Sequence, residues 1–148
     1  LIGLVGSEMC IRDRDYIFGY TILNDVSARD VQTAHKQWYF GKSLDGFTPI
    51  GPCIVTADAF ADYPPRLGIR SFVNGEKRQD SNTALQIFDI DHVIAELSQG
   101  MTLKAGTIIA TGTPAGVGMG MDPPQFLKPG DVVRCEIDGI GTLTNPVR

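Results

Sequence analysis

Residues 67–82 read LGIRSFVNGEKRQDSN and decide the fold class, because they hold the clearest strand–turn–strand pattern in the chain. The dipeptide Asn74-Gly75 is a strong signal for a two-residue turn between antiparallel strands. We therefore expect a strand over 67–73 that pairs with a second strand directly after the turn.

The segments on either side of this hairpin extend the same pattern. Pro129-Gly130 precedes two strands, expected over 132–137 and 141–144, with Asp138-Gly139 at the turn between them. β-Branched and aromatic residues predict further strands over 15–25, 54–57 and 107–111. Helices are expected over 28–36, where Ser27 is the cap and Asp30 the third residue, and over 91–99. Because strands outnumber helices, the sequence predicts an α+β fold, mostly β, on a mixed or antiparallel sheet.

Length and composition fit one folded domain and exclude several classes of protein. The chain has 148 residues, of which 43% are hydrophobic and 20% charged, so it is neither disordered nor a coiled coil. Its apolar runs are shorter than the ~20 residues of a membrane helix, and its net charge of -4 argues against nucleic acid or a membrane as partner. Cys10, Cys53 and Cys135 form no disulfide pattern, which favours a cytoplasmic location.

The first fourteen residues, LIGLVGSEMCIRDR, stand apart from the rest of the chain. Neither a helical nor a strand period continues from them into the next segment, and they lack the features of a signal peptide. We therefore leave residues 1–14 unassigned as a foreign or misjoined segment, and expect a domain over 15–148 that begins near Asp15.

One group of residues whose side chains can bind a cation or a substrate surrounds the first expected helix. Asp25 lies between a strand and a helix start, and Arg29 and Gln32 lie three residues apart on one helical face. A carboxylate there could hold a hard cation, while the guanidinium and the amide grip a substrate carboxylate. An ordinary capped helix with solvated charges would show the same spacing.

Two loops add further candidates. Lys42 lies in FGKSLD, where small neighbours let the backbone approach a ligand and the ammonium could stabilise an enolate. Thr113 lies in ATGTPAGVG, a glycine-rich stretch that resembles an anion nest without being a Walker loop or a dinucleotide fingerprint. A surface lysine and a structural turn remain the alternatives for these two positions.

Several motifs resemble, in order, the C-terminal catalytic domain of the fumarylacetoacetate hydrolase family. They are NDVSARDVQ, GKSLDGFTPIGP, VNGEKRQDSNT, IIATGTPAGVGMG, FLKPGDVV and GIGTLTNPV, and together they span about residues 15–147. The resemblance implies a β-roll of mixed sheets with short flanking helices, usually a cytoplasmic homodimer. It also implies Mg²⁺ or Mn²⁺ as cofactor and a 2-oxo or diketo acid as substrate, as in the catabolism of aromatic compounds.

The same resemblance implies a role for each matched residue. Asp25 matches the family's metal-binding aspartate, and Lys42 matches the catalytic lysine beside the metal and the substrate. Arg29, Gln32 and Thr113 match positions that contact substrate oxygens. In such a site a metal-stabilised enolate forms during C–C cleavage, decarboxylation or isomerisation.

The chain also departs from the family pattern. The family's Glu-x-Glu metal ligands and its His-Glu lid pair should precede Asp25, but Glu8 is the only glutamate before that position. We therefore expect a truncated catalytic domain, whose parent is a metal-dependent hydrolase, lyase or isomerase. The alternative is a catalytically silent β domain that acts only in oligomer packing.

Overall fold

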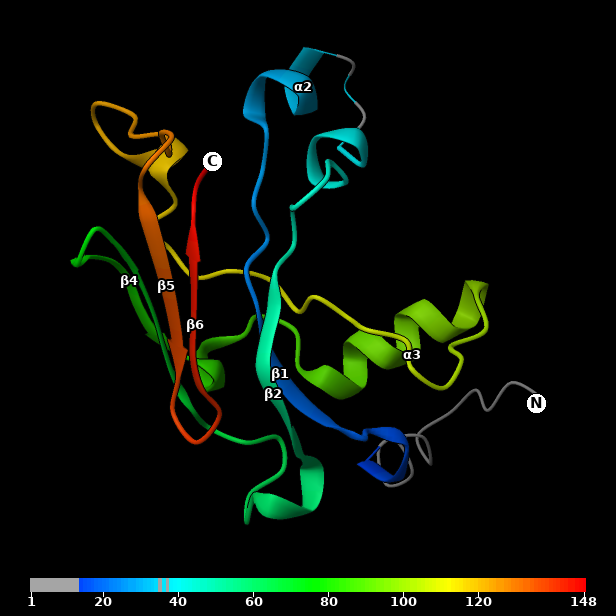
Figure 1. The fold of residues 1–148 in the computed structure, drawn as a ribbon. Helices are drawn as coiled ribbons and strands as arrows, with labels where there is room; N and C mark the ends of the chain where they lie inside the picture. The colour runs from blue at the N-terminus through cyan, green and yellow to red at the C-terminus, as the bar shows by residue number, and fades with distance from the viewer. Residues whose placement is uncertain (1–13, 35, 37) are drawn as a thin grey trace.

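The strands form two antiparallel sheets in the computed structural model, which describes residues 14–34, 36 and 38–148 (Figure 1). One sheet pairs β1 (Gly19–Leu23) with β2 (Ile50–Thr56). The other has the order β4-β3-β5-β6. Its strands are β3 (Gly68–Val73), β4 (Glu76–Asn82), β5 (Val132–Ile137) and β6 (Gly141–Pro146). The predicted fold class, α+β and mostly β, is confirmed.

The β3–β4 hairpin forms where the sequence predicts it. Asn74 and Gly75 both adopt positive φ, at 52° and 85°, as a type I′ turn requires. The Asn74 side chain donates to the Asp131 carboxylate at 2.8 Å and accepts from the Val132 amide at 2.9 Å. The turn residue therefore also fixes the start of β5, the neighbour of β3 in the sheet.

The two sheets meet where β2 approaches β6. Cys53 Sγ lies 3.5 Å from the carbonyl oxygen of Ile140, and Pro52 packs beside Gly141. Among the described residues, the buried hydrophobic side chains are Ile22, Val133 and Ile140. This core is small, and many large apolar side chains, including those of residues 38–40, stay exposed.

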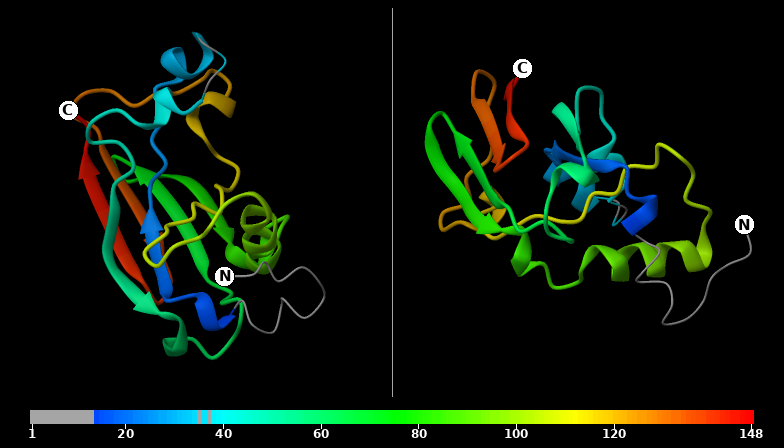
Figure 2. Two further views of the ribbon diagram at one scale, coloured as in Figure 1. Left: turned by 90° about the vertical axis from the view of Figure 1, so that its right-hand side faces the viewer. Right: turned by 90° about the horizontal axis from the view of Figure 1, so that it is seen from below.

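Helices lie at the periphery of the sheets. The longer one, α3 (Ile90–Gly100), is capped by Asp89, whose carboxylate accepts a hydrogen bond from the His92 amide at 2.8 Å. The views of Figure 2 show α3 running past one side of the β1–β2 pair, and the chain doubling back beside α3. No helix within the described ranges is long and apolar enough to cross a membrane.

The first helix, α2 (Arg29–Ala34), is shorter than the predicted 28–36. Ser27 Oγ donates to the Asp25 carbonyl oxygen at 3.4 Å instead of capping the helix. The remaining helical segments are single 3₁₀ turns: η1 (Arg14–Tyr16), η2 (Phe40–Lys42), η3 (Ala57–Ala59), η4 (Thr83–Leu85) and η5 (Gly118–Gly120).

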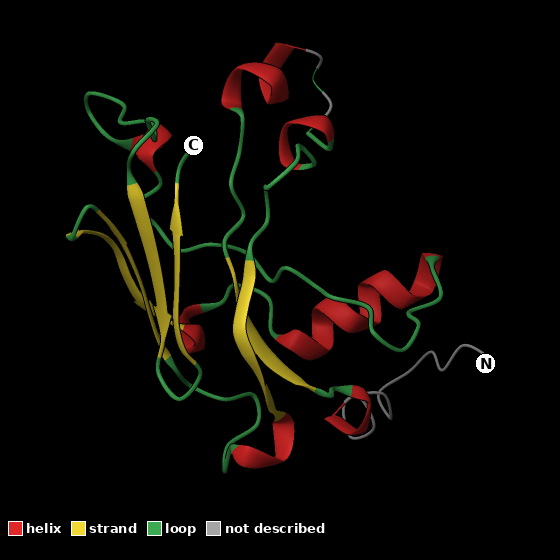
Figure 3. Ribbon diagram, in the orientation of Figure 1, coloured by secondary structure: helices red, strands yellow, loops and turns green. Residues whose placement is uncertain are grey.

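The strand predicted over 107–111 is wrong. Residues 107–117 form an irregular loop, drawn green in Figure 3, and Ile108 is 60% exposed. A strand needs a neighbour to satisfy its backbone groups, and no strand of the described part pairs with this segment. The predicted strand over 15–25 is confined to 19–23, and the one expected at 54–57 begins earlier, at Ile50.

Candidate functional site

Helix α2 and the 3₁₀ turn η2 form one packed unit. The Ala28 amide donates to the Gly41 carbonyl at 2.9 Å, directly before α2 begins. Gly41 is buried, and a Cβ at this position would lie 2.8 Å from the Gln32 Cβ and 2.9 Å from the Ala28 carbonyl oxygen. A glycine is therefore needed to bring the loop that carries Lys42 onto α2.

This unit joins two of the predicted residues directly. Lys42 Nζ lies 2.5 Å from Asp25 Oδ2, although the two residues are 17 positions apart. Asp25 follows β1, and the preceding residue, Asn24, donates its amide to the Pro49 carbonyl at 3.0 Å. The side chains of Lys42 and Asp25 are 26% and 46% exposed, so the pair is open to solvent and to a ligand.

A second pair lies on α2 itself. Arg29 Nη1 donates to Gln32 Oε1 at 2.7 Å, across one turn of the helix. Gln32 is only 4% exposed, whereas Arg29 is half-buried. The buried amide therefore holds the guanidinium in place, and the predicted substrate contact falls more naturally on Arg29 than on Gln32.

Thr113 is held from the other sheet, by a residue that the sequence analysis missed. Gln79 of β4 donates Nε2 hydrogen bonds to Thr113 Oγ1 and to the Pro114 carbonyl, both at 2.8 Å. Ser71 Oγ on β3 donates to Gln79 Oε1, also at 2.8 Å. Gln79 stands in the motif VNGEKRQDSNT, but nothing in the local spacing ties it to a residue 34 positions later.

The structure thus brings together four of the five predicted site residues. Arg29 and Gln32 belong to α2 and Lys42 to η2, which pack against each other, and Asp25 joins them through its contact with Lys42. Across the described ranges, no hydrogen bond or ion pair joins Thr113 to any of these four. That Thr113 meets the same substrate as these four residues stays a prediction.

The residues of this site do not by themselves fit a bound divalent ion. The described part of the chain contains no group of three or more His, Cys, Asp or Glu side chains that could hold a metal. Asp25 offers one carboxylate, and the Lys42 ammonium already contacts it. Mg²⁺ prefers several oxygen ligands in octahedral geometry, so Asp25 could supply only part of such a site.

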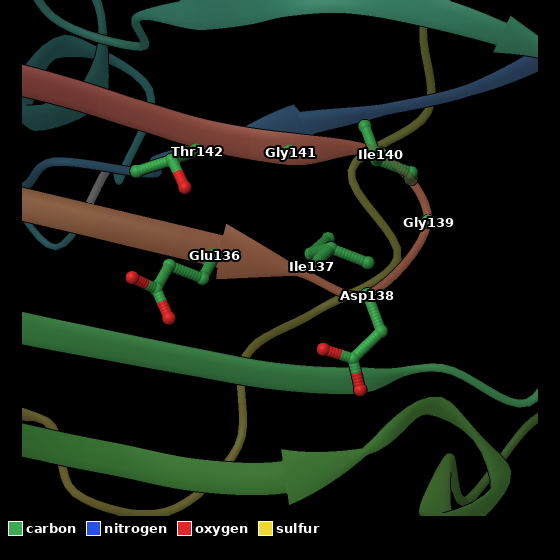
Figure 4. Close-up of a pocket in the computed structure, with 7 residues that line it drawn as sticks. All are labelled: Glu136, Ile137, Asp138, Gly139, Ile140, Gly141 and Thr142. Carbon is green, nitrogen blue, oxygen red and sulfur yellow. The ribbon is translucent and has the colours of Figure 1, made fainter.

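A hollow of about 520 Å³ at the β5–β6 turn lies apart from the predicted residues (Figure 4). Its wall is formed by residues 136–142, including Asp138. Arg70 Nη1 lies 2.8 Å from Asp138 Oδ1, and this hydrogen bond lowers the pKa of the Asp138 carboxyl. Because Arg70 stabilises this carboxylate on an exposed hairpin, we assign the pair to the fold rather than to a site.

A family model decides the relationship of the chain to known proteins. The model described as "Fumarylacetoacetate (FAA) hydrolase C-terminal" matches residues 7–148, which is most of the chain. The chain belongs to the fumarylacetoacetate hydrolase family. This match confirms the resemblance drawn from the six sequence motifs, and it begins within the segment 1–14 that the sequence analysis left unassigned.

Individual members of the fumarylacetoacetate hydrolase family support the match. Oxaloacetate tautomerase YisK of Bacillus subtilis strain 168 is 49% identical over 148 residues, which are 99% of this chain and 49% of that protein. Fumarylacetoacetate hydrolase from Exiguobacterium antarcticum superposes with a TM-score of 0.89 at 52% identity, covering 93% of this chain and 49% of that one. A Mycobacterium smegmatis 5-carboxymethyl-2-hydroxymuconate delta-isomerase gives 0.80 at 46% identity, covering 92% and 50%. The chain thus spans about half the length of these relatives.

Proposed function

We propose that the whole protein is an enzyme that acts on a 2-oxo or diketo acid through an enolate. The observation that carries this proposal is the packing of η2, which holds Lys42 against Asp25, onto α2, which carries the Arg29–Gln32 pair, in a chain of this family. An ammonium, a guanidinium and a carboxylate at one surface suit a small anionic substrate.

The names of the relatives support one shared chemistry. A tautomerase of oxaloacetate interconverts a ketone with its enol, and a delta-isomerase of a hydroxymuconate moves a double bond next to an oxygenated carbon. Hydrolysis of fumarylacetoacetate breaks a C–C bond beside a carbonyl group. In each reaction negative charge develops on an oxygen, and a fixed cation near that oxygen lowers the barrier.

The described residues take different roles in substrate binding and enolate stabilisation, according to their positions. Arg29, oriented by Gln32, binds a carboxylate of the substrate with its planar fork of N–H donors. Lys42, held by Asp25, places an ammonium where the enolate oxygen develops. Thr113 hydrogen-bonds to a further substrate oxygen through its hydroxyl group. Fixing the acid at two points orients the reacting carbon, which contributes to the rate by itself.

Metal dependence is a further part of the proposal. Asp25 would supply one oxygen ligand to Mg²⁺ or Mn²⁺ in the whole protein, with the other ligands coming from residues that the structure does not describe. When bound, such an ion acts as a Lewis acid toward carboxylate and keto oxygens.

The proposal is tested by assaying the whole protein on a panel of acids. Oxaloacetate reports tautomerisation, acylpyruvates report C–C hydrolysis or decarboxylation, and hydroxymuconate-type acids report isomerisation, each with Mg²⁺, with Mn²⁺ and after chelation. We expect turnover of at least one acid that chelation abolishes. No turnover of any acid with either ion would contradict the proposal.

We further propose that the whole protein is a cytoplasmic homodimer. Trp38, Tyr39 and Phe40 are 70%, 79% and 58% exposed, and aromatic side chains of this kind are enriched in protein interfaces. Cys53 and Cys135 are both free, which suits a reducing compartment. Sedimentation of the whole protein tests the dimer, and replacing Trp38 and Tyr39 by serine should weaken it if these rings lie in the interface.

One observation favours a second candidate for the 148-residue chain alone. Because the described residues lack a metal-ligand cluster, this chain by itself could be a silent β domain that only packs against other subunits. Measurable turnover by the isolated chain would exclude this alternative.

A further inference from the structure

Gln79 fixes the direction in which the Thr113 hydroxyl can hydrogen-bond. The Pro114 carbonyl can only accept a hydrogen bond, so the nitrogen of the Gln79 amide must face it, at 2.8 Å. The oxygen of the amide then faces the other way, where Ser71 Oγ donates to it at 2.8 Å. The Pro114 carbonyl therefore fixes the orientation of the amide group, and Ser71, whose hydroxyl can donate, fits that orientation.

This orientation decides which role is left to Thr113. The Gln79 nitrogen also donates to Thr113 Oγ1, at 2.8 Å, so this oxygen serves as an acceptor toward the protein. A hydroxyl group has one hydrogen to donate, and nothing in its contact with Gln79 uses it. Because Thr113 is exposed, its hydrogen is available to a ligand.

A β-bulge brings the responsible strand to the loop. Ser71 lies opposite Gln79, but Phe72 lies opposite Lys77, so Arg78 is the extra residue of β4. Consecutive side chains of a regular strand point to opposite faces, yet those of Arg78 and Gln79 both reach the 113–125 loop. A bulge re-aims side chains in this way, and bulges are over-represented next to active sites.

Arg78 fixes the far part of the same loop. Its guanidinium lies 3.2 Å from Met121 Sδ and donates to the Gln125 side-chain oxygen. The carbonyl oxygen of Arg78 lies against Gly116, where a Cβ would collide with it. The bulged part of β4 therefore holds the 113–125 loop at three points, and the Gln79 contact is the one that reaches a candidate site residue.

We propose that Gln79 is a positioning residue that presents the Thr113 hydroxyl as a hydrogen-bond donor to an anionic oxygen of the substrate. This inference rests on the proposed function, in which Thr113 contacts the substrate. It adds the direction of that hydrogen bond, with Thr113 as the donor. A donor hydroxyl selects a carboxylate or enolate oxygen over a hydroxyl or amide hydrogen of a competing ligand.

Substitution of Gln79 in the whole protein tests the proposal. Gln79→Glu keeps the shape but puts a carboxylate against Thr113 Oγ1, so the hydroxyl hydrogen turns inward and the donor is lost to the substrate. Gln79→Met removes the hydrogen bonds without reversing them. We expect kcat/KM to fall about tenfold for Gln79→Met and further for Gln79→Glu, on an acid that the wild type turns over. Gln99→Met, the same exchange on α3, is the matched control and should be unaffected.

A double-mutant cycle with Thr113→Val separates positioning from general damage. If Gln79 acts through the hydroxyl, Gln79→Met should cost clearly less in the Thr113→Val background than in the wild type. Additive losses, or a Gln79→Glu variant as active as Gln79→Met, would overturn the proposal.

A readout without substrate distinguishes this inference from the proposed function. In a spectrum of methyl-labelled threonine, Thr113→Val identifies the Thr113 signal, which Gln79→Glu should shift and Gln99→Met should not. An unshifted signal would overturn the role of Gln79 and would leave the proposed function untouched. Wild-type kinetics for Thr113→Val instead overturn the substrate contact in the proposed function, and with it the donor role.

Discussion

Lys42 Nζ and Asp25 Oδ2 lie 2.5 Å apart and connect the end of β1 to the 3₁₀ turn η2. Neither residue is buried, and a solvent-exposed ion pair contributes only about 0–1 kcal/mol to stability. The pair therefore matters less for stability than for the position that it gives to the Lys42 ammonium. Asp25 holds the ammonium of Lys42, and η2, to which Lys42 belongs, packs against the helix α2 that carries Arg29.

We predict that Lys42→Met in the whole protein lowers kcat about 10²-fold, with a smaller change in KM. The reason is that the ammonium acts mainly on charge that develops in the transition state. Steady-state kinetics on the acid found by the substrate panel measure the effect. Lys77→Met, which removes another lysine–aspartate pair on β4, is the control. Equal losses in the two variants would contradict a catalytic role for Lys42.

Asp25→Ala should abolish metal-dependent turnover of the whole protein while leaving the fold intact. Asp25 is proposed as a metal ligand, and its side chain is 46% exposed, so the free energy of unfolding should change by less than about 1 kcal/mol. Activity is measured across a Mg²⁺ titration and stability by urea unfolding. Asp58→Ala, an exposed aspartate of η3, is the control. Full activity of Asp25→Ala at saturating Mg²⁺ would refute the ligand role.

How much of the site the sequence could predict depended on how local each contact is. Arg29 and Gln32 lie one helical turn apart, so their spacing alone predicts that they meet. The Gln79–Thr113 contact joins β4 to a loop 34 positions later, and no periodicity encodes it. It depends on a bulge at Arg78, and the hydrophobic pattern of a strand does not reveal a single extra residue.

The fold followed the same rule. Asn74-Gly75 sets both φ angles of its turn and so predicts the β3–β4 hairpin without knowledge of the rest of the chain. The apolar residues at 107–111 suit a strand equally well, but a strand also needs a hydrogen-bonding neighbour. No strand in the described ranges provides one, and Ile108 stays exposed.

The isolated 148-residue chain should bind Mg²⁺ with a dissociation constant above about 1 mM, because one carboxylate cannot replace enough of the ion's water shell. The described residues offer no cluster of three ligands, and Lys42 competes with a cation for Asp25. Titration calorimetry of the purified chain measures the affinity. A micromolar dissociation constant would show that the chain carries a complete site.

The unfolding free energy should fall as the pH drops below about 4, the usual range of an aspartate. Hydrogen bonds from Arg70 and Asn74 lower the pKa of Asp138 and Asp131, respectively. Since these carboxyls bind protons less readily when folded, acid favours the unfolded chain, and the stabilisation is fully present above that range. Urea midpoints between pH 2.5 and 6 for Asp138→Asn, Arg70→Gln and the double variant test this. Each single change should flatten the pH dependence, and additive flattening would contradict the Arg70–Asp138 linkage.

Gly116→Ala should destabilise the protein more than Gly106→Ala, although both glycines have positive φ, at 107° and 83°. Both φ values disfavour a residue with a Cβ, at a cost of about 1–2 kcal/mol or more. At Gly106 that Cβ would meet open space, whereas at Gly116 it would collide with the Arg78 carbonyl oxygen on the bulge of β4. The 113–125 loop would then have to move away from the strand that holds Thr113 through Gln79. Urea unfolding of both variants measures the difference, and the methyl signal of Thr113 should shift only in Gly116→Ala. Equal destabilisation, with an unmoved Thr113 signal, would show that the loop does not depend on its close contact with β4.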